Sequence, residues 1–196
     1  MNDSLWKLAD DEYEFIKGEV AHIIEKYRIK CIPVSGFEIA AKMNISIIAY
    51  SGLHGQSLEA AMKASLDGFL LEYKGREYIF YNDMNRSYER QNWTILHELG
   101  HIVLDHTGHS DCDEAEADFF AKYAIAPPVL IDKIQDKSPN GILEAFDISE
   151  EAAFYSYEYY RKWLFHHQKT ACYTAYELKL LKCYEENKAE ASAVIF

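Results

Sequence analysis

The sequence predicts an α+β fold that is mainly helical and contains a small three-stranded sheet. Most segments carry apolar residues at spacings of three and four, which is the period of an amphipathic helix. Three short runs before residue 82 are instead rich in β-branched and aromatic residues, which is typical of strands. The chain has 196 residues, of which 49% are hydrophobic, so it can bury a substantial core. We therefore expect one domain that spans residues 1–196.

The first part of the chain is expected to alternate helices and strands. An amphipathic helix is predicted over 10–28, and a shorter one over 35–43, after Pro33. The predicted strands are 45–50, 68–73 and 77–81, and the last two form a hairpin in which Gly75 takes a positive φ. Because the sheet immediately precedes the next helix, one face of the sheet should pack on that helix.

That next helix carries the motif on which the functional interpretation depends. Residues 93–101 read Trp-Thr-Ile-Leu-His-Glu-Leu-Gly-His. On a helix, His97 and His101 lie on one face about one turn apart and could bind one Zn²⁺ together. Glu98 would lie close enough to take a proton from water at the metal. Histidines at this spacing also occur in ordinary amphipathic helices, so the motif alone leaves that alternative open.

A zinc peptidase usually has a third protein ligand, which we sought downstream of His101. A His-x-x-Gly-x-x-His continuation is excluded because positions 104 and 107 are Leu104 and Thr107. A second helix is expected to begin at residue 111, with Ser110 or Asp111 as its N-cap, after a break at 107–109.

An antiparallel arrangement of these two helices selects the third ligand. Glu114 then lies at the same depth as His101, facing it. Asp118 lies one turn deeper beside His97, where its carboxylate could accept the ring N–H of His97 and fix its tautomer. Glu116 points about 200° around the helix from Glu114 and fits less well. We therefore predict Glu114 as the third ligand.

Two consecutive motifs carry a family resemblance. The chain reads His-Glu-Leu-Gly-His over 97–101, then Glu-Ala-Glu-Ala-Asp-Phe-Phe-Ala over 114–121, then Ala-Pro-Pro over 126–128. Residues 86–130 resemble the ImmA/IrrE family of metallo-endopeptidases, whose hallmark is this pair of helices ending at a proline. The resemblance implies a minimal zincin-like fold, one Zn²⁺ held by His97, His101 and Glu114, and Glu98 as general base. Members are often encoded beside a helix-turn-helix repressor that they cleave.

Charge and cysteine usage limit the possible partners and the compartment. The net charge of −12 argues against general affinity for nucleic acid or for acidic membranes. The N-terminal residues lack a basic start followed by an apolar run, and no segment reaches 18 uninterrupted apolar residues. The four cysteines show no Cys-x-x-Cys spacing. We expect a cytoplasmic protein, and we interpret Cys112, near Glu114, as an incidental small residue rather than a ligand.

The chain is expected to be helical again beyond Pro128. Helices are predicted over 129–134, 141–146 and 149–164, the last with Ser149 as N-cap. Residues 143–153 resemble a helix-turn-helix corner, but the second helix begins with Glu150 and Glu151, which favours packing or partner contact over DNA reading. We divide the domain into a zincin-like core over 1–125, a C-terminal helical part over 126–188 and a frayed tail over 189–196.

Two functions remain open at the level of sequence. The first is a zinc endopeptidase that cleaves a protein, with a helix-turn-helix repressor of a mobile element or stress regulon as the best single candidate. The second is a regulatory protein that binds a transcription factor through its C-terminal helices without cleaving it. The residue that would stabilise the developing oxyanion is also open, and the candidates are Tyr88, His106, His109 and Tyr123.

Overall fold

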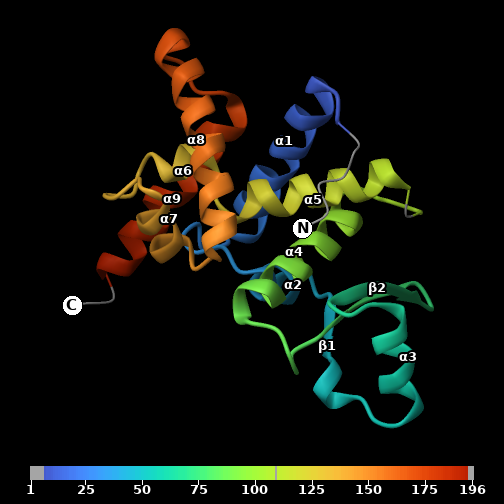
Figure 1. Ribbon diagram of the computed structural model, residues 1–196. Coiled ribbons are helices and arrows are strands. Elements are labelled where there is room, and N and C mark those ends of the chain that lie inside the picture. The colour runs from blue at the N-terminus through green and yellow to red at the C-terminus, as the bar shows by residue number, and fades with distance from the viewer. Residues whose placement is uncertain (1–6, 109, 194–196) are drawn as a thin grey trace.

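The computed structural model describes residues 7–108 and 110–193, and it confirms the predicted mainly helical α+β class. The first elements are α1 (Asp10–Tyr27), α2 (Gly36–Lys42), β1 (Ser46–Ala49), the 3₁₀ turn η1 (Tyr50–Gly52), α3 (Gln56–Ala64), β2 (Gly68–Tyr73) and β3 (Arg76–Tyr81). The later elements are α4 (Tyr88–Val103), α5 (Asp111–Ile125), α6 (Pro128–Ile131), α7 (Pro139–Phe146), α8 (Glu150–Thr170) and α9 (Ala175–Ala193). Figure 1 shows α4 and α5 in the middle, with the sheet and α3 on one side and the C-terminal helices on the other.

The sheet has the strand order β1-β3-β2, so β2 is an edge strand. β1 pairs with β3 in parallel, with Ser46 opposite Tyr78, and β2 pairs with β3 as an antiparallel hairpin. The hairpin turn consists of Lys74 and Gly75, with φ of 54° and 69°. Two residues with positive φ suit the right-handed twist of the flanking strands. The turn is therefore one residue shorter than predicted, and Arg76 already belongs to β3.

The sheet packs on α4, as predicted, and the two elements are closest at Gly68. A Cβ atom on Gly68 would lie 2.5 Å from the Phe80 carbonyl oxygen and 2.6 Å from Thr94 Cγ2. Nothing larger than glycine therefore fits where β2 begins. Because Thr94 lies one helical turn before Glu98, this contact places the start of β2 beside the His-Glu-Leu-Gly-His segment.

α4 and α5 also approach each other closely, and small residues make this possible. A Cβ atom on Gly100 would lie 3.0 Å from Ala117 Cα and 3.2 Å from Phe120 Cβ. Ala117 and Phe120 are both buried at this contact between the two helices. The backbones therefore pass near enough for side chains on one helix to meet those on the other.

Serine side chains cap the N-termini of many of the helices. Each accepts a hydrogen bond from the backbone N–H three residues further on, which satisfies a donor that the helix itself cannot pair. The predicted caps Ser110 and Ser149 are both confirmed. The same contact is made by Ser35, Ser87 and Ser138.

The C-terminal region is more helical than the sequence analysis expected. α8 continues to Thr170, and α9 extends to Ala193 through most of the predicted frayed tail. The side chain of Asn187 accepts a hydrogen bond from the backbone N–H of Cys31 at 2.9 Å, which ties this end of α9 to the turn after α1. A tertiary contact thus holds this end of the helix, next to the segment where the sequence analysis expected fraying. Positions 194–196 of the tail lie outside the described residues.

Among the described helices, none is both long enough and apolar enough to cross a lipid bilayer. All four cysteines lie within the described residues, and none of them forms a disulfide bond.

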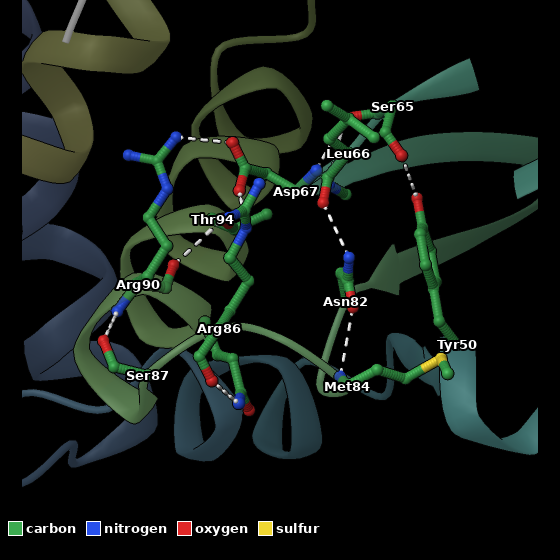
Figure 2. Close-up of polar contacts among 12 residues, drawn as sticks. Tyr50, Ser65, Leu66, Asp67, Asn82, Met84, Arg86, Ser87, Arg90 and Thr94 are labelled. Carbon is green, nitrogen blue, oxygen red and sulfur yellow. Dashed lines mark hydrogen bonds and ion pairs between the residues drawn. The ribbon is translucent and has the colours of Figure 1, made fainter. Parts of the chain in front are cut away.

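A polar network fixes residues 65–67, the segment that leads into β2 (Figure 2). The Tyr50 hydroxyl donates to the Ser65 carbonyl at 3.0 Å, and the Asn82 side-chain amide donates to the Leu66 carbonyl at 2.8 Å. The Asp67 carboxylate forms 2.6 Å ion pairs with Arg86, which lies just before α4, and with Arg90, in the first turn of α4. The hydrogen bond from Arg90 and the charges of both arginines lower the pKa of Asp67. The network anchors the start of β2 to α4.

We predict that Gly68→Ala lowers the free energy of unfolding by about 1–3 kcal/mol, because the added methyl group overpacks the contact with Phe80 and Thr94. Gly18→Ala is the control, since a Cβ atom on Gly18 meets nothing within 4 Å. That substitution in the interior of α1 should instead stabilise by about 0.5–1 kcal/mol. Urea unfolding of both variants measures the difference, and equal effects would contradict the close packing at Gly68.

The Asp67 contacts predict a pH-dependent contribution to stability. A carboxyl group whose pKa is lowered by folding stabilises the protein above its ordinary pKa of 3.8, and this contribution disappears as the pH falls. Asp67→Asn should therefore cost about 1 kcal/mol at pH 7, with a smaller cost near pH 3. Urea unfolding across this range measures the difference, and a cost that does not change with pH would rule out the ion pairs as its source.

Candidate metal centre

Three side chains from α4 and α5 point their donor atoms at one position. His97 Nε2 lies 3.2 Å from His101 Nε2 and 3.3 Å from Glu114 Oε2. His101 Nε2 lies 3.6 Å from Glu114 Oε1. The residues that the structure brings together here are thus the three that the sequence analysis selected as ligands. The close crossing of the two helices at Gly100 makes these distances possible.

The spacing of these atoms fits a tetrahedral metal ion. Zinc binds imidazole nitrogen and carboxylate oxygen at about 2.0–2.1 Å, so two ligands of a regular tetrahedron lie about 3.3–3.4 Å apart. The three separations, 3.2, 3.3 and 3.6 Å, bracket this value, although the last two run to different oxygens of the Glu114 carboxylate. Two imidazoles and one carboxylate also form a common ligand set of catalytic zinc sites, which leave the fourth position open.

Glu98 lies next to these donor atoms in a cavity of about 460 Å³. The cavity is lined by His97, Glu98, His101 and Glu114 and, across from α4, by the start of β2. Glu98 is only 7% exposed, which is unusual for a carboxylate side chain. A buried carboxylate beside a candidate metal position is placed to handle a proton there.

His97 has a carboxylate partner on α5. Its Nδ1 atom lies 3.0 Å from Asp118 Oδ1, so the ring can donate its N–H to Asp118 while Nε2 faces the metal position. In the metal-free chain, burial by itself would lower the pKa of His97. The hydrogen bonds to Asp118 and Glu114 outweigh burial and raise this pKa to about 9. Asp118 therefore occupies the position that the sequence analysis assigned to it.

Three of the four candidates for the oxyanion-stabilising role lie elsewhere. Tyr88 is 46% exposed and stacks on Phe37, while Tyr123 is buried and lines a different cavity. His106 contacts the Nδ1 side of His101, which is the side away from the metal position. None of these three lines the cavity that contains Glu98. His109 lies outside the described residues.

Sequence reasoning missed several residues of the cavity wall. Arg90 is the only arginine or lysine among the described lining residues, and it is held there by Asp67. A signal for Arg90 exists, because residues 90, 94, 97 and 101 follow a spacing of three and four along one face of α4. Asp67 carries no such signal, since its position depends on how β2 packs against α4.

The neighbours of His101 were also missed. The second candidate carboxylate, Glu116, accepts a hydrogen bond from His106 Nε2 at 2.8 Å rather than facing the metal position. His106 in turn contacts His101, with 2.9 Å between their Nδ1 atoms. Glu116 is therefore linked to the site through another side chain.

This part of the chain matches a known protein family. The peptidase M78 family, described as the IrrE N-terminal-like domain, matches residues 56–155, just over half of the chain. The match begins at α3, ends within α8 and includes both helices of the candidate metal centre. No curated protein matches the sequence. The chain therefore belongs to the peptidase M78 family of IrrE N-terminal-like domains, in agreement with the resemblance inferred from its two motifs.

Proposed function

We propose that this protein is a zinc-dependent endopeptidase that cleaves a protein substrate. The observation that carries the proposal is the convergence of His97, His101 and Glu114, spaced for a tetrahedral ion, beside the buried carboxylate of Glu98. Membership of a peptidase family supports peptide-bond hydrolysis with a metal. Imidazole and carboxylate ligands in a tetrahedral arrangement favour zinc over magnesium or calcium, which prefer oxygen ligands.

Glu98 is the general base in this proposal. A bound zinc ion would supply a Lewis acid that polarises the peptide carbonyl and makes water easier to deprotonate. Glu98 takes a proton from the attacking water and passes it to the leaving amine. Glu98 follows His97 directly on α4 and lines the same cavity as the three ligands, but it is not itself a ligand in this proposal. Asp118 keeps His97 in the tautomer whose Nε2 atom is free to bind metal.

The edge strand β2 supports an extended peptide as substrate. Gly68, Phe69 and Leu70 line the same cavity as Glu98, and among the described residues β2 pairs along one edge only, with β3. The other edge offers backbone N–H and C=O groups to a peptide that adds to the sheet as a further strand. Such pairing would hold the scissile bond beside Glu98. It would depend mainly on the backbone of the substrate and only weakly on its side chains.

A second hollow supports a large substrate rather than a short peptide. This cavity, of about 830 Å³, lies between α1, α5 and α8. Trp93 and Asp118 line both this cavity and the one that contains Glu98. A protein chain that leaves the candidate metal centre on this side would therefore meet further surface on three helices.

We infer that a helix-turn-helix repressor is the substrate, and that the reaction takes place in the cytoplasm. Support for the repressor comes from the ImmA/IrrE resemblance, because members of that family are often encoded beside such a protein. Support for the compartment comes from the absence of disulfide bonds among the four described cysteines, which suits a reducing environment. The net charge of −12 favours a protein substrate over direct contact with DNA.

The alternative is a regulatory protein that binds its partner without cleaving it. The observation that favours this alternative is a group of exposed aromatic side chains on α8, namely Phe154, Tyr155 and Phe165. Exposed aromatic residues are common in protein interfaces. A partner bound there would contact the C-terminal helices rather than the cavity that contains Glu98.

For metal binding, we predict one Zn²⁺ per chain and a graded loss of affinity in two variants. Asp118→Ala should weaken binding about 10–100-fold because His97 loses its hydrogen-bond acceptor. Glu114→Ala should weaken binding more, because it removes a ligand. Competition with a chromophoric chelator measures the dissociation constants. Glu151→Ala, at an exposed position on α8, is the control. Zinc that binds as tightly to Glu114→Ala as to the wild type would refute the ligand set.

For catalysis, we predict that Glu98→Gln keeps the zinc and the fold but lowers the rate of cleavage by about 10²–10⁴-fold, because the general base is lost. The assay co-produces each form with the helix-turn-helix repressor encoded nearby and follows the mass of the repressor. Continued cleavage by Glu98→Gln would refute the mechanism. A repressor that stays intact with the wild type but is released from DNA would favour the non-proteolytic alternative.

A further inference from the structure

His106 is held over His101 by the way in which α4 ends. Its backbone N–H donates to the His101 carbonyl at 3.0 Å, and the backbone N–H of Asp105 donates to the Ile102 carbonyl at 3.2 Å. Asp105 has a left-handed φ of 57°. These features define a Schellman motif, in which the chain folds back across the last helical turn. The helix terminus therefore brings the side chain of His106 onto that of His101.

The side chains continue this contact as a chain of hydrogen bonds. His101 Nδ1 lies 2.9 Å from His106 Nδ1, and His106 Nε2 lies 2.8 Å from Glu116 Oε2. The side chain of His106 is only 5% exposed, and that of Glu116 is 20% exposed. A buried imidazole thus joins a candidate metal ligand on α4 to a carboxylate on α5.

The protons in this chain can be assigned from the metal position. Two nitrogens 2.9 Å apart share a single proton. His101 can bind metal through Nε2 only if that atom carries no proton, so its ring proton must be on Nδ1. His106 Nδ1 then accepts this proton's hydrogen bond, and the proton of His106 must be on Nε2. The Glu116 carboxylate accepts that second hydrogen bond.

We propose that His106, anchored by Glu116, is a positioning residue that holds His101 in its metal-binding tautomer and orientation. The proposal rests on the proposed function in one respect, since it requires His101 to be a metal ligand. His106 does not touch the cavity that contains Glu98, so it acts only through His101.

The two candidate histidine ligands are thus supported in different ways. His97 Nδ1 donates directly to the Asp118 carboxylate, whereas His101 Nδ1 is linked to the Glu116 carboxylate through the imidazole of His106. Glu98, Glu114 and Asp118 already place three carboxylates at or beside the candidate metal centre. Because His106 intervenes, Glu116 can orient His101 without adding a fourth negative charge next to Glu98.

A second metal ion is the competing explanation for this cluster, because donor atoms of His106, Asp113 and Glu116 also lie near one another. The distances favour hydrogen bonding instead. His106 Nε2 and Glu116 Oε2 are 2.8 Å apart, which is shorter than the separation of about 3.3 Å between two ligands of one zinc ion. The Asp113 carboxylate is already used in the N-cap of α5, where it accepts from the backbone N–H of Ser110 at 2.9 Å.

The test uses the full chain, with three test substitutions and one control substitution. His106→Phe removes the acceptor for His101 but keeps an aromatic ring. Glu116→Leu removes the acceptor for His106, whereas Glu116→Gln keeps a carbonyl oxygen that can accept the same N–H. His22→Phe, at an exposed position on α1, is the control. Three quantities are measured: the Zn²⁺ dissociation constant, the free energy of unfolding without metal, and the tautomer of His106 from ¹H–¹⁵N spectra of the imidazole nitrogens.

We expect His106→Phe and Glu116→Leu to weaken zinc binding about 10–100-fold, with Glu116→Gln and His22→Phe close to the wild type. In the zinc-loaded wild type, His106 should carry its proton on Nε2. If His106→Phe does not fold, the Glu116 pair and the wild-type tautomer decide the question.

Several results would overturn the proposal while the proposed function stands. These are undiminished zinc affinity in His106→Phe, equal losses in Glu116→Gln and Glu116→Leu, a His106 proton on Nδ1, or a second zinc ion bound per chain. Failure of the proposed function gives a different pattern: the wild type itself would bind no zinc if the ligand set were wrong, or would bind zinc and leave the substrate intact if it did not cleave.

Discussion

The close crossing of α4 and α5 is the constraint on which the rest of the site depends. Gly100 lacks a Cβ atom at the position where one would lie 3.0 Å from Ala117 Cα. Because the backbones come this close, imidazoles on α4 and carboxylates on α5 can converge within the distances of a coordination sphere. A larger residue at Gly100 or Ala117 would push the two helices apart. The ligands of a metal site must keep their positions closely, so even a small displacement would weaken metal binding.

The end of α4 has two consequences for the site. Its Schellman motif turns the chain towards α5, and the same fold-back brings His106 over the ring of His101. A residue with positive φ at this position is usually glycine, and here it is Asp105. Local backbone geometry and the surroundings of a candidate ligand are thus determined by a single turn. The loop after α4 is therefore part of the site, although it carries none of the three candidate ligands.

The opposite wall of the cavity comes from segments distant in sequence from the two helices. Residues 65–67 are held in place by contacts with Tyr50, Asn82, Arg86 and Arg90 (Figure 2). These contacts position the start of β2 at the wall of the cavity. Gly68 allows β2 to approach Thr94 without a steric clash. The sheet thus does more than cover the core, because it supplies an open strand edge beside Glu98.

The sequence by itself determined the fold class and most of the helices and strands. It also selected five candidate site residues that the structure places together, namely His97, Glu98, His101, Glu114 and Asp118. These could be predicted because a helix repeats with a fixed period, so spacing along the chain translates directly into faces and depths. Only the tertiary structure decided the contacts that follow no such period. The packing of β2 brings Asp67 to Arg90, and the turn after α4 brings His106 to Glu116. Asn187, near the end of α9, accepts a hydrogen bond from the backbone of Cys31. Each of these contacts joins segments whose relative position depends on how the whole chain packs, and no local pattern encodes that position.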